Sequence, residues 1–380
     1  MSTKLSKNIK YDKEKEKDFQ NTLKQRVEAY FKNNNISKKG NFYMWFKVIF
    51  LLSSYWALWY TLAFHKFNFI TSSLLIITFI ITTITLAFTV AHDAVHNTIS
   101  KNTKINDLIY WFSFNMLGPN AYLWRIRHNN AHHFCVNIPG SDVDIEGSEA
   151  MRFAPHIKWK PIHKFQHFFA PILYSIFILH WIFIKDFDLY QRKEFGNVSN
   201  LNHPWWRFLE LVLLKLIYIT YMLVIPILYS GHSIGTVIIA FFIFQFILSF
   251  FVTMSFVSSH LGNVSLFVFH DENHKLPHSF YEHQLHTSID FHPISSIASF
   301  FFGGFNAHVA HHMFPDICSV HYPELTKIIK RTTKEFNLPY HEMPIHKLYY
   351  SHFQLLERMG RNPVAGNQHM LNPDSAKHHV

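Results

Sequence analysis

The sequence predicts an all-helical integral membrane protein, with four transmembrane helices in two hairpins and a cytosolic helical cap that holds two metal ions. Three observations lead to this fold class. Of the 380 residues, 49% are hydrophobic and 16% are charged, which suits a membrane protein with a sizeable water-facing part. Four apolar stretches are long enough to cross a bilayer. The chain also contains 29 histidines, several of them in short clusters.

The four apolar stretches form two pairs. Each is close to the roughly 20 residues that cross a bilayer as a helix. They cover residues 42–64, 67–91, 205–229 and 234–256. Only His65 and Lys66 separate the first pair, and only residues 230–233 separate the second. Such short connections predict two tight antiparallel hairpins.

Two complete hairpins return the chain to the side of the membrane where it began. The N-terminal tail, residues 91–204 and the chain after residue 256 therefore share one face. The lysine-rich N-terminus predicts that this face is cytosolic, because basic flanks stay inside. We expect a multi-pass protein, such as one of a bacterial inner membrane, with both termini and the histidine clusters in the cytosol.

Two further apolar segments, residues 108–123 and 168–183, are short for a span and are interrupted by Pro119 and Pro171. They could be interfacial or buried helices. If only one of them crossed the membrane, the histidine clusters would lie on opposite sides.

The remaining sequence suggests simple flanking regions. Residues 1–40 are expected to be a polar cytosolic tail, flexible or loosely helical, before a membrane domain over 41–345 and a C-terminal tail over 346–380. The net charge of +10 fits a membrane surface, because the basic residues surround no nucleic-acid motif. Two cysteines allow one disulfide at most, so a reducing compartment is expected. The N-terminus has no apolar core of a secretory signal peptide.

Three histidine clusters carry the functional prediction. Their sequences are HDAVH from His92, HNNAHH from His128 and HVAHH from His308. On a helix, residues three or four apart share a face, so each cluster can aim imidazoles at one point. In a chain so rich in histidine, the pair in the first cluster could arise by chance. The second and third clusters each contain three histidines on the same predicted side, which is a more specific indication of a metal site. Eight imidazoles are too many for one ion and suit two.

Imidazoles without carboxylates or thiolates suit iron, copper, zinc or nickel. No catalytic side chain is expected beyond the metal ligands. Polar neighbours could orient the imidazoles by accepting their second N–H. The candidates are Asp93, Asn129, Asp142, Asp144, Asp290 and Asn306. Cys135 could be a soft ligand, but a packing role is favoured. A further run, His270, His274 and His278, contains Pro277 and polar residues, which favours a loop over a ligand set.

The clusters in their sequence context resemble a known family. The order HDAVH, LWRIRHNNAHH and GGFNAHVAHHMFP is similar to that of the membrane fatty acid desaturases. The following PDICSVHYPELTKIIKRTTKEFNLPY resembles the bacterial linoleoyl-CoA or front-end-like branch, and the resemblance covers residues 42–340. It implies an enzyme of unsaturated fatty acid biosynthesis that inserts a cis double bond into a long-chain acyl-CoA or acyl-lipid. It also implies O2, two electrons and two iron ions (Fe2+/Fe3+).

The resemblance implies eight ligands and a ninth from the region after the fourth span. The eight are His92, His96, His128, His132, His133, His308, His311 and His312. For the ninth, His260 is preferred over His283. His308 stands where front-end members usually have Gln. The HPGG haem motif of a fused cytochrome b5 domain is absent from the sequence, so a separate donor of the ferredoxin or cytochrome b5 type is expected.

The substrate is expected in an apolar tunnel held by the spans. Arg125 or Arg127 could meet a CoA or lipid phosphate, although either could equally be a basic residue of the cytosolic surface. A membrane di-iron hydroxylase or ketolase is the nearer alternative. A non-catalytic metal-binding or transport protein is less favoured, because the predicted spans contain few of the ionisable groups that mark an ion pathway.

Overall fold

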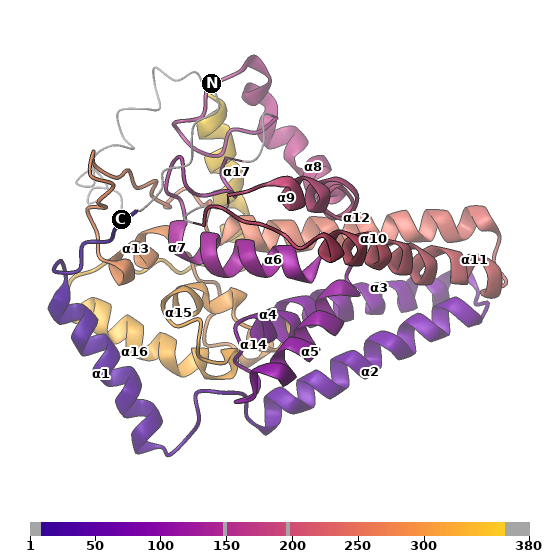
Figure 1. Cartoon of the computed structure of the whole chain (residues 1–380), viewed down its shortest axis with the longest axis horizontal. Coiled ribbons are helices and arrows are strands. Elements are labelled where there is room, and N and C mark those ends of the chain that lie inside the picture. Colours follow the sequence, from indigo (N-terminus) through magenta and orange to yellow (C-terminus); the bar gives the residue numbers. More distant parts are fainter. Residues whose placement is uncertain (1–8, 147–149, 195–197, 362–380) are drawn as a thin grey trace.

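The structure is a computed structural model that describes residues 9–146, 150–194 and 198–361. Within these ranges the regular structure is helical, apart from two isolated bridges that pair Lys10 with Lys275 and Asp290 with Glu342. The predicted all-helical class is confirmed. Figure 1 shows long helices that extend together to one end of the molecule, with shorter helices gathered at the other end.

The four predicted apolar stretches form long helices. They are α2 (Phe42–Phe64), α3 (Phe69–Leu86) with η1 (Ala87–Ala91) and α4 (His92–Val95), α10 (Trp205–Ile219) with η5 (Thr220–Val224) and α11 (Ile225–Tyr229), and α12 (Ile234–Ser258). Polar caps fix where three of them begin, because the side chains of Asn41, Asn68 and Ser233 accept the N–H of Met44, Thr71 and Thr236, respectively. In Figure 1, the α2–α3 and α11–α12 turns lie at the same end.

A fifth helical rod also has the length and apolar composition to cross a membrane. It comprises η3 (Pro161–Phe165), α8 (Gln166–His180), η4 (Trp181–Lys185) and α9 (Asp186–Gln191). It packs along α12, where Ser249 Oγ accepts the N–H of Ile178 and donates to the carbonyl of Tyr174. The described residues therefore contain five candidate spans, not four, and the additional one includes the ambiguous segment 168–183.

The other ambiguous segment, 108–123, is not one long helix. It is divided between α5 (Thr103–Asn115) and α6 (Ala121–Arg127). Gly118 lies in the connection with φ 104°, a backbone conformation that favours glycine. Neither helix is long enough to be a candidate span.

The shorter helices surround the histidine clusters. They are η2 (His128–His132), α7 (His133–Cys135), α13 (Phe280–Thr287), α14 (Ser296–Phe302), η6 (Phe305–Ala307), α15 (His308–Met313), η7 (Ser319–His321) and α16 (Tyr322–Glu335). Among them, α14 packs against the end of α3 and against η1, and α15 packs against α13 and α16.

Two helices come from the flanking regions. In the N-terminal region, α1 (Lys17–Asn33) buries Phe19, Leu23 and Val27, which recur every four residues, against α16. At the other end, α17 (Ile345–Gly360) packs on α8 and α12. The N-terminal helix thus supports the shorter helices, whereas the C-terminal helix packs on two of the long apolar rods. Residues 362–380 of the expected C-terminal tail lie outside the described residues.

Candidate metal centre

The three histidine clusters lie on three helical segments that meet at one point. His92 begins α4 after the π-helical turn η1, and His96 caps the end of α4. The second cluster occupies η2 and the start of α7, and the third begins α15. In the π-helical turn η2, residues five apart come into register, which brings Nε2 of His128 to 3.2 Å from Nε2 of His133.

A glycine lets the third cluster approach the first. Gly303 has φ 58°, and a Cβ at this position would lie 2.5 Å from the carbonyl oxygen of Phe88 in η1. Asp290 then fixes the start of α15, because its Oδ1 accepts the N–H of Val309 at 2.8 Å. The chain therefore places the end of α14, shortly before His308, directly against the turn that precedes His92.

Nine histidines form two adjacent groups of potential ligands and a linking group. Within each group, one ligand atom from every residue lies within 4.8 Å of the others. The first group is His92, His96, His128 and His311. The second group is His132, His260, His308 and His312. His133 groups with His311 and His312, so it lies between the two.

The spacing of the ring nitrogens fits shared metal ions. Nε2 of His96 lies 3.0 Å from Nε2 of His128, and Nε2 of His308 lies 2.7 Å from Nε2 of His260. Two nitrogens that bind one ion at about 2.0–2.1 Å and at a right angle are about 3 Å apart. Nε2 of His92, of His311 and of His312 is buried without a hydrogen-bond partner among the described residues. Unpaired buried nitrogens that converge in this way can hold metal ions.

Burial keeps these imidazoles in the form that binds metal. Burial lowers the pKa of His260 to about 4, against the hydrogen bond at its ring. Burial and then the neighbouring rings hold the pKa values of His128, His133 and His312 well below the usual range. The rings are therefore neutral at neutral pH, and neutral imidazole is the ligand form.

Three of the rings have partners that orient them. Nδ1 of His260 donates to the carbonyl oxygen of Thr287 at 2.9 Å, and Nδ1 of His311 lies 3.3 Å from the hydroxyl of Tyr322. Nδ1 of His132 lies 3.0 Å from Oδ2 of Asp144, which is an ion-pair distance without the alignment of a hydrogen bond. Neither Thr287 nor Tyr322 was expected from the sequence, because both contacts depend on folding rather than on a motif.

Among the six polar candidates in the described structure, Asp144 contacts a ligand imidazole, whereas the others hold backbone or hydroxyl groups. Asp93 accepts the Thr98 hydroxyl and the Ser319 N–H and hydroxyl, which ties the first cluster to the chain after the third. Asp142 accepts the N–H of Asn137 at 2.8 Å. The side-chain amides of Asn129 and Asn306 donate to backbone carbonyls, and Asp290 caps α15.

Two competing ligands lie outside both groups. Nε2 of His283 donates to the carbonyl oxygen of Val136 at 2.8 Å. Cys135 is buried in an apolar cluster with Ile138 and Val268. His260, in contrast, lies inside the second group.

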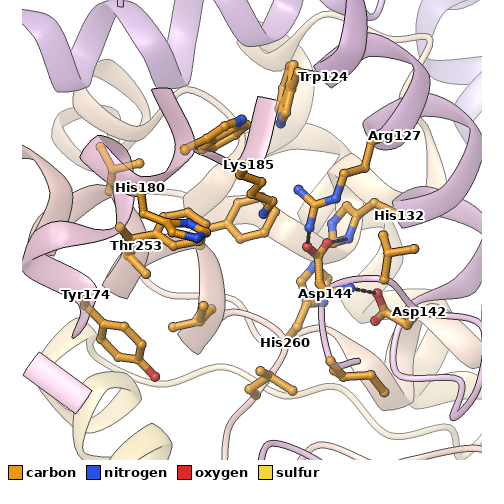
Figure 2. Close-up of a pocket in the computed structure, with 18 of the residues that line it drawn as sticks. Trp124, Arg127, His132, Asp142, Asp144, Tyr174, His180, Lys185, Thr253 and His260 are labelled. Atoms are coloured by element: carbon orange, nitrogen blue, oxygen red, sulfur yellow. Dashed lines mark hydrogen bonds and ion pairs between the residues drawn. The ribbon is translucent and has the colours of Figure 1, made fainter. Parts of the chain in front are cut away.

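An apolar cavity of about 470 Å³ opens beside the second histidine group. His92, His132 and His260 line it. Most of its wall is aromatic or aliphatic and comes from α6, α8, η4 and α12, including Trp124, Tyr174, Phe177, Trp181, Val252 and Phe256. Figure 2 shows Tyr174 and Thr253 on one side of the cavity and His132 and His260 on the other. The arrangement can hold an elongated apolar ligand against the metal centre.

Comparison with known proteins decides the family. Residues 69–344 match the family described as "Fatty acid desaturase". The chain belongs to the fatty acid desaturase family. It is accordingly an oxidoreductase of the desaturase type, and its apolar helices and histidine groups make it a membrane protein with a candidate metal centre.

This desaturase is similar to curated proteins whose names describe them as lipid desaturases. It is 30% identical over 348 residues to an sn-1 linoleoyl-lipid 6-desaturase of Synechocystis, covering 90% of this chain and 96% of the relative. It is 27% identical over 349 residues to an enzyme of the same name from Arthrospira platensis, covering 91% and 93%. It is 30% identical over 360 residues to an acyl-lipid (8-3)-desaturase of Physcomitrium patens, covering 93% and 74%.

The two arginines that were expected near a lipid headgroup differ in their position relative to the cavity. Arg125 pairs with Asp107 at 2.7 Å and lies over the ring of Tyr110, away from the cavity wall. Arg127 is buried, lines the cavity and forms an ion pair with Asp144 (Figure 2). Lys185 of η4 also lines the cavity. Lys185 could not be predicted from the sequence, because it lies in an apolar segment whose neighbours become apparent only in the fold.

Proposed function

We propose that this desaturase introduces a cis double bond into the acyl chain of a membrane lipid, in an O2-dependent reaction at two iron ions. The observation that carries the proposal is the position of the two histidine groups beside an apolar cavity. An acyl-lipid substrate is favoured over acyl-CoA, because the relatives described above are named as lipid desaturases.

In this proposal each histidine group binds one iron. The first ion is assigned to His92, His96, His128 and His311, and the second to His132, His260, His308 and His312. His133 completes the set between them. Nine neutral imidazoles suit iron among the metals that such ligands accept. Nε2 of His308 lies close to Nε2 of His260, so both can bind the same ion. His308 can therefore serve as a ligand at the position where front-end members usually have Gln.

The bound iron ions would supply the O2 chemistry that removes two hydrogens from neighbouring methylenes. The residues of the chain position the substrate and exclude water. Trp124, Phe256 and Phe305 form an apolar wall beside the ligands, which favours an acyl chain over water. The contacts of Thr287 and Asp144 with His260 and His132 fix the rings before substrate arrives.

The charged residues of the cavity are proposed to face the lipid headgroup. Lys185 and Arg127 both line the cavity, and Asp144 compensates the charge of Arg127. Lys185 is thus the better candidate for a phosphate, because the cation of Arg127 already has a partner. We assign no headgroup contact to Arg125.

The position of the clusters supports four membrane crossings. Three apolar helical rods, Pro161–Gln191, Trp205–Tyr229 and Ile234–Ser258, lie between the second and third clusters. Three full crossings would put those clusters on opposite faces, yet His133 and His312 belong to one ligand group. We propose that Pro161–Gln191 lies with the cytosolic cap, because a third crossing between the second and third clusters would separate them. The basic N-terminus supports a cytosolic cap, where a separate ferredoxin or cytochrome b5 would deliver electrons.

Fatty-acid profiling tests the proposal. The protein is expressed with an electron donor in cells whose lipids contain few polyunsaturated chains. New unsaturated acyl chains are expected in the lipid fraction with the natural sequence, and none with His132→Ala. Oxygenated chains instead of unsaturated ones, or unchanged products with His132→Ala, would contradict it.

A further inference from the structure

A second cluster of metal-binding side chains lies on α13, outside the nine histidines. His278 precedes the helix by two residues, Glu282 lies in its first turn and His286 lies near its end. Glu282 and His286 are four residues apart and share one face of the helix, and His278 lies four residues before Glu282. One ligand atom from each lies within 4.8 Å of the others.

The cluster is buried, and two of its polar atoms lack a hydrogen-bond partner. His278 and Glu282 are each 6% exposed. Nδ1 of His278 and Oε2 of Glu282 have no hydrogen-bond partner among the described residues. Nδ1 of His278 lies 2.9 Å from Oε1 of Glu282, but without the alignment of a hydrogen bond. A buried carboxylate oxygen left without a partner is costly, so something else is expected to satisfy it.

The distances fit one ion bound by all three side chains. Nε2 of His286 lies 3.8 Å from Oε1 of Glu282, which is too long for a hydrogen bond. Two ligands at about 2.0–2.1 Å from one zinc ion in a tetrahedron are about 3.4 Å apart. The separations of 2.9 Å and 3.8 Å lie on either side of that value. The side chain of His286 is 18% exposed, so solvent can reach this side of the cluster and supply a fourth ligand.

We propose that His278, Glu282 and His286 form a third metal site, which binds a single divalent ion such as zinc and braces α13. Two imidazoles and one carboxylate are a known zinc donor set, and the carboxylate distinguishes this site from the all-histidine centre. The site goes beyond the proposed desaturation and takes no part in it.

The place of α13 explains what such an ion would stabilise. The helix packs against α15, which carries the third histidine cluster. On another side of α13, His283 bonds the carbonyl of Val136, just after the second cluster. The carbonyl of His278 accepts the N–H of Asp12, which ties in the N-terminal segment. An ion at this site would therefore hold together segments that support the second and third clusters.

Zinc binding to the purified full-length protein with its iron loaded tests the proposal. The protein is equilibrated with Zn2+ and passed through a desalting column, and zinc and iron are counted by mass spectrometry. One zinc per chain is expected. The X-ray absorption spectrum of this zinc should indicate a mixture of imidazole and oxygen ligands. Binding should also raise the melting temperature, because an ion that binds only the folded state stabilises it.

Variants separate this site from the iron centre. Glu282→Gln keeps the shape of the side chain and should lose the zinc, as should His286→Ala, while the iron count stays that of the natural sequence. Glu272→Gln and His270→Ala change the same residue types in the neighbouring loop and should keep the zinc. Zinc retained by Glu282→Gln and His286→Ala would overturn the proposal, and so would zinc uptake that releases an equal amount of iron. Loss of desaturation in the natural protein with the zinc site intact would count against the proposed function alone.

Discussion

The histidine groups and the cavity beside them differ in how they are built. In the first and third sequence clusters, spacing on a helix places two rings in one ligand group, His92 with His96 and His308 with His312, whereas the second cluster divides its three rings among the groups. The cavity draws its wall from α6, α8, η4 and α12, which meet only in the folded chain. The comparison indicates that the metal-ligand set depends largely on local spacing, whereas the proposed substrate cavity depends on packing. Substitutions in the two regions should therefore fail in different ways.

The largest effect is expected at the metal centre. His312→Ala removes a ring that belongs to two ligand groups, so desaturation should fall by about 100-fold or more and bound iron should decrease. Product analysis and iron counting on the same preparation measure both. His270→Ala, a histidine outside the centre, is the control and should keep both values. Full activity in His312→Ala would show that the groups are not the catalytic centre.

A smaller effect is expected from the partner of a ligand. Asp144→Asn keeps the shape but weakens the contact with Nδ1 of His132 and the ion pair with Arg127. Partners of metal ligands typically contribute 10–100-fold, so a loss of about 10-fold in activity or iron affinity is expected. Iron titration and turnover measure it. Asp107→Asn, whose partner Arg125 lies away from the cavity, is the matched control. Equal losses in both variants would assign the effect to general stability.

A substitution in the cavity should change the products of the reaction and leave the iron content of the protein unchanged. Thr253 is buried in α12 and lines the cavity, and Thr253→Phe would fill part of it. We expect products from shorter acyl chains, or a displaced double bond, with unchanged iron. Mass spectrometry of derivatised fatty acids gives chain length and bond position. An unchanged product pattern with normal turnover would remove this cavity from the substrate path.

The smallest effect is expected at the charged part of the cavity. Lys185→Gln removes a cation that lines it, which should raise KM several-fold and leave kcat nearly unchanged, because a headgroup contact contributes equally before and during the reaction. Lys164→Gln, in η3 outside the cavity lining, is the control. A fall in kcat without a change in KM would place Lys185 in the chemistry instead.

The same distinction explains what the sequence could predict. The all-helical class, the four long apolar helices and the three clusters follow from hydropathy and spacing, and the structure groups all eight cluster histidines. The fifth apolar rod was left ambiguous, because Pro171 and a short apolar core resemble a buried helix as much as a span. Thr287 and Tyr322, which contact ligand imidazoles, lie outside any motif. Asp93 and Asp290 accept the N–H groups of Ser319 and Val309, which lie more than 15 positions away in the sequence.

The spacing of histidines in the sequence indicated only part of the cluster formed by His278, Glu282 and His286. The run of His270, His274 and His278 was expected to be a loop, and its residues do lie before α13. The spacing that matters begins at His278 and continues through Glu282 to His286, across the start of the helix. A search for histidines alone therefore missed the carboxylate between them.

The iron content of the purified full-length protein, measured together with its turnover, tests the central claim most directly. Two groups of imidazoles predict two iron ions per chain, with desaturation that is lost when a chelator removes the iron and restored when iron is returned. One iron per chain in fully active protein, or desaturation that persists after complete removal of iron, would contradict the account.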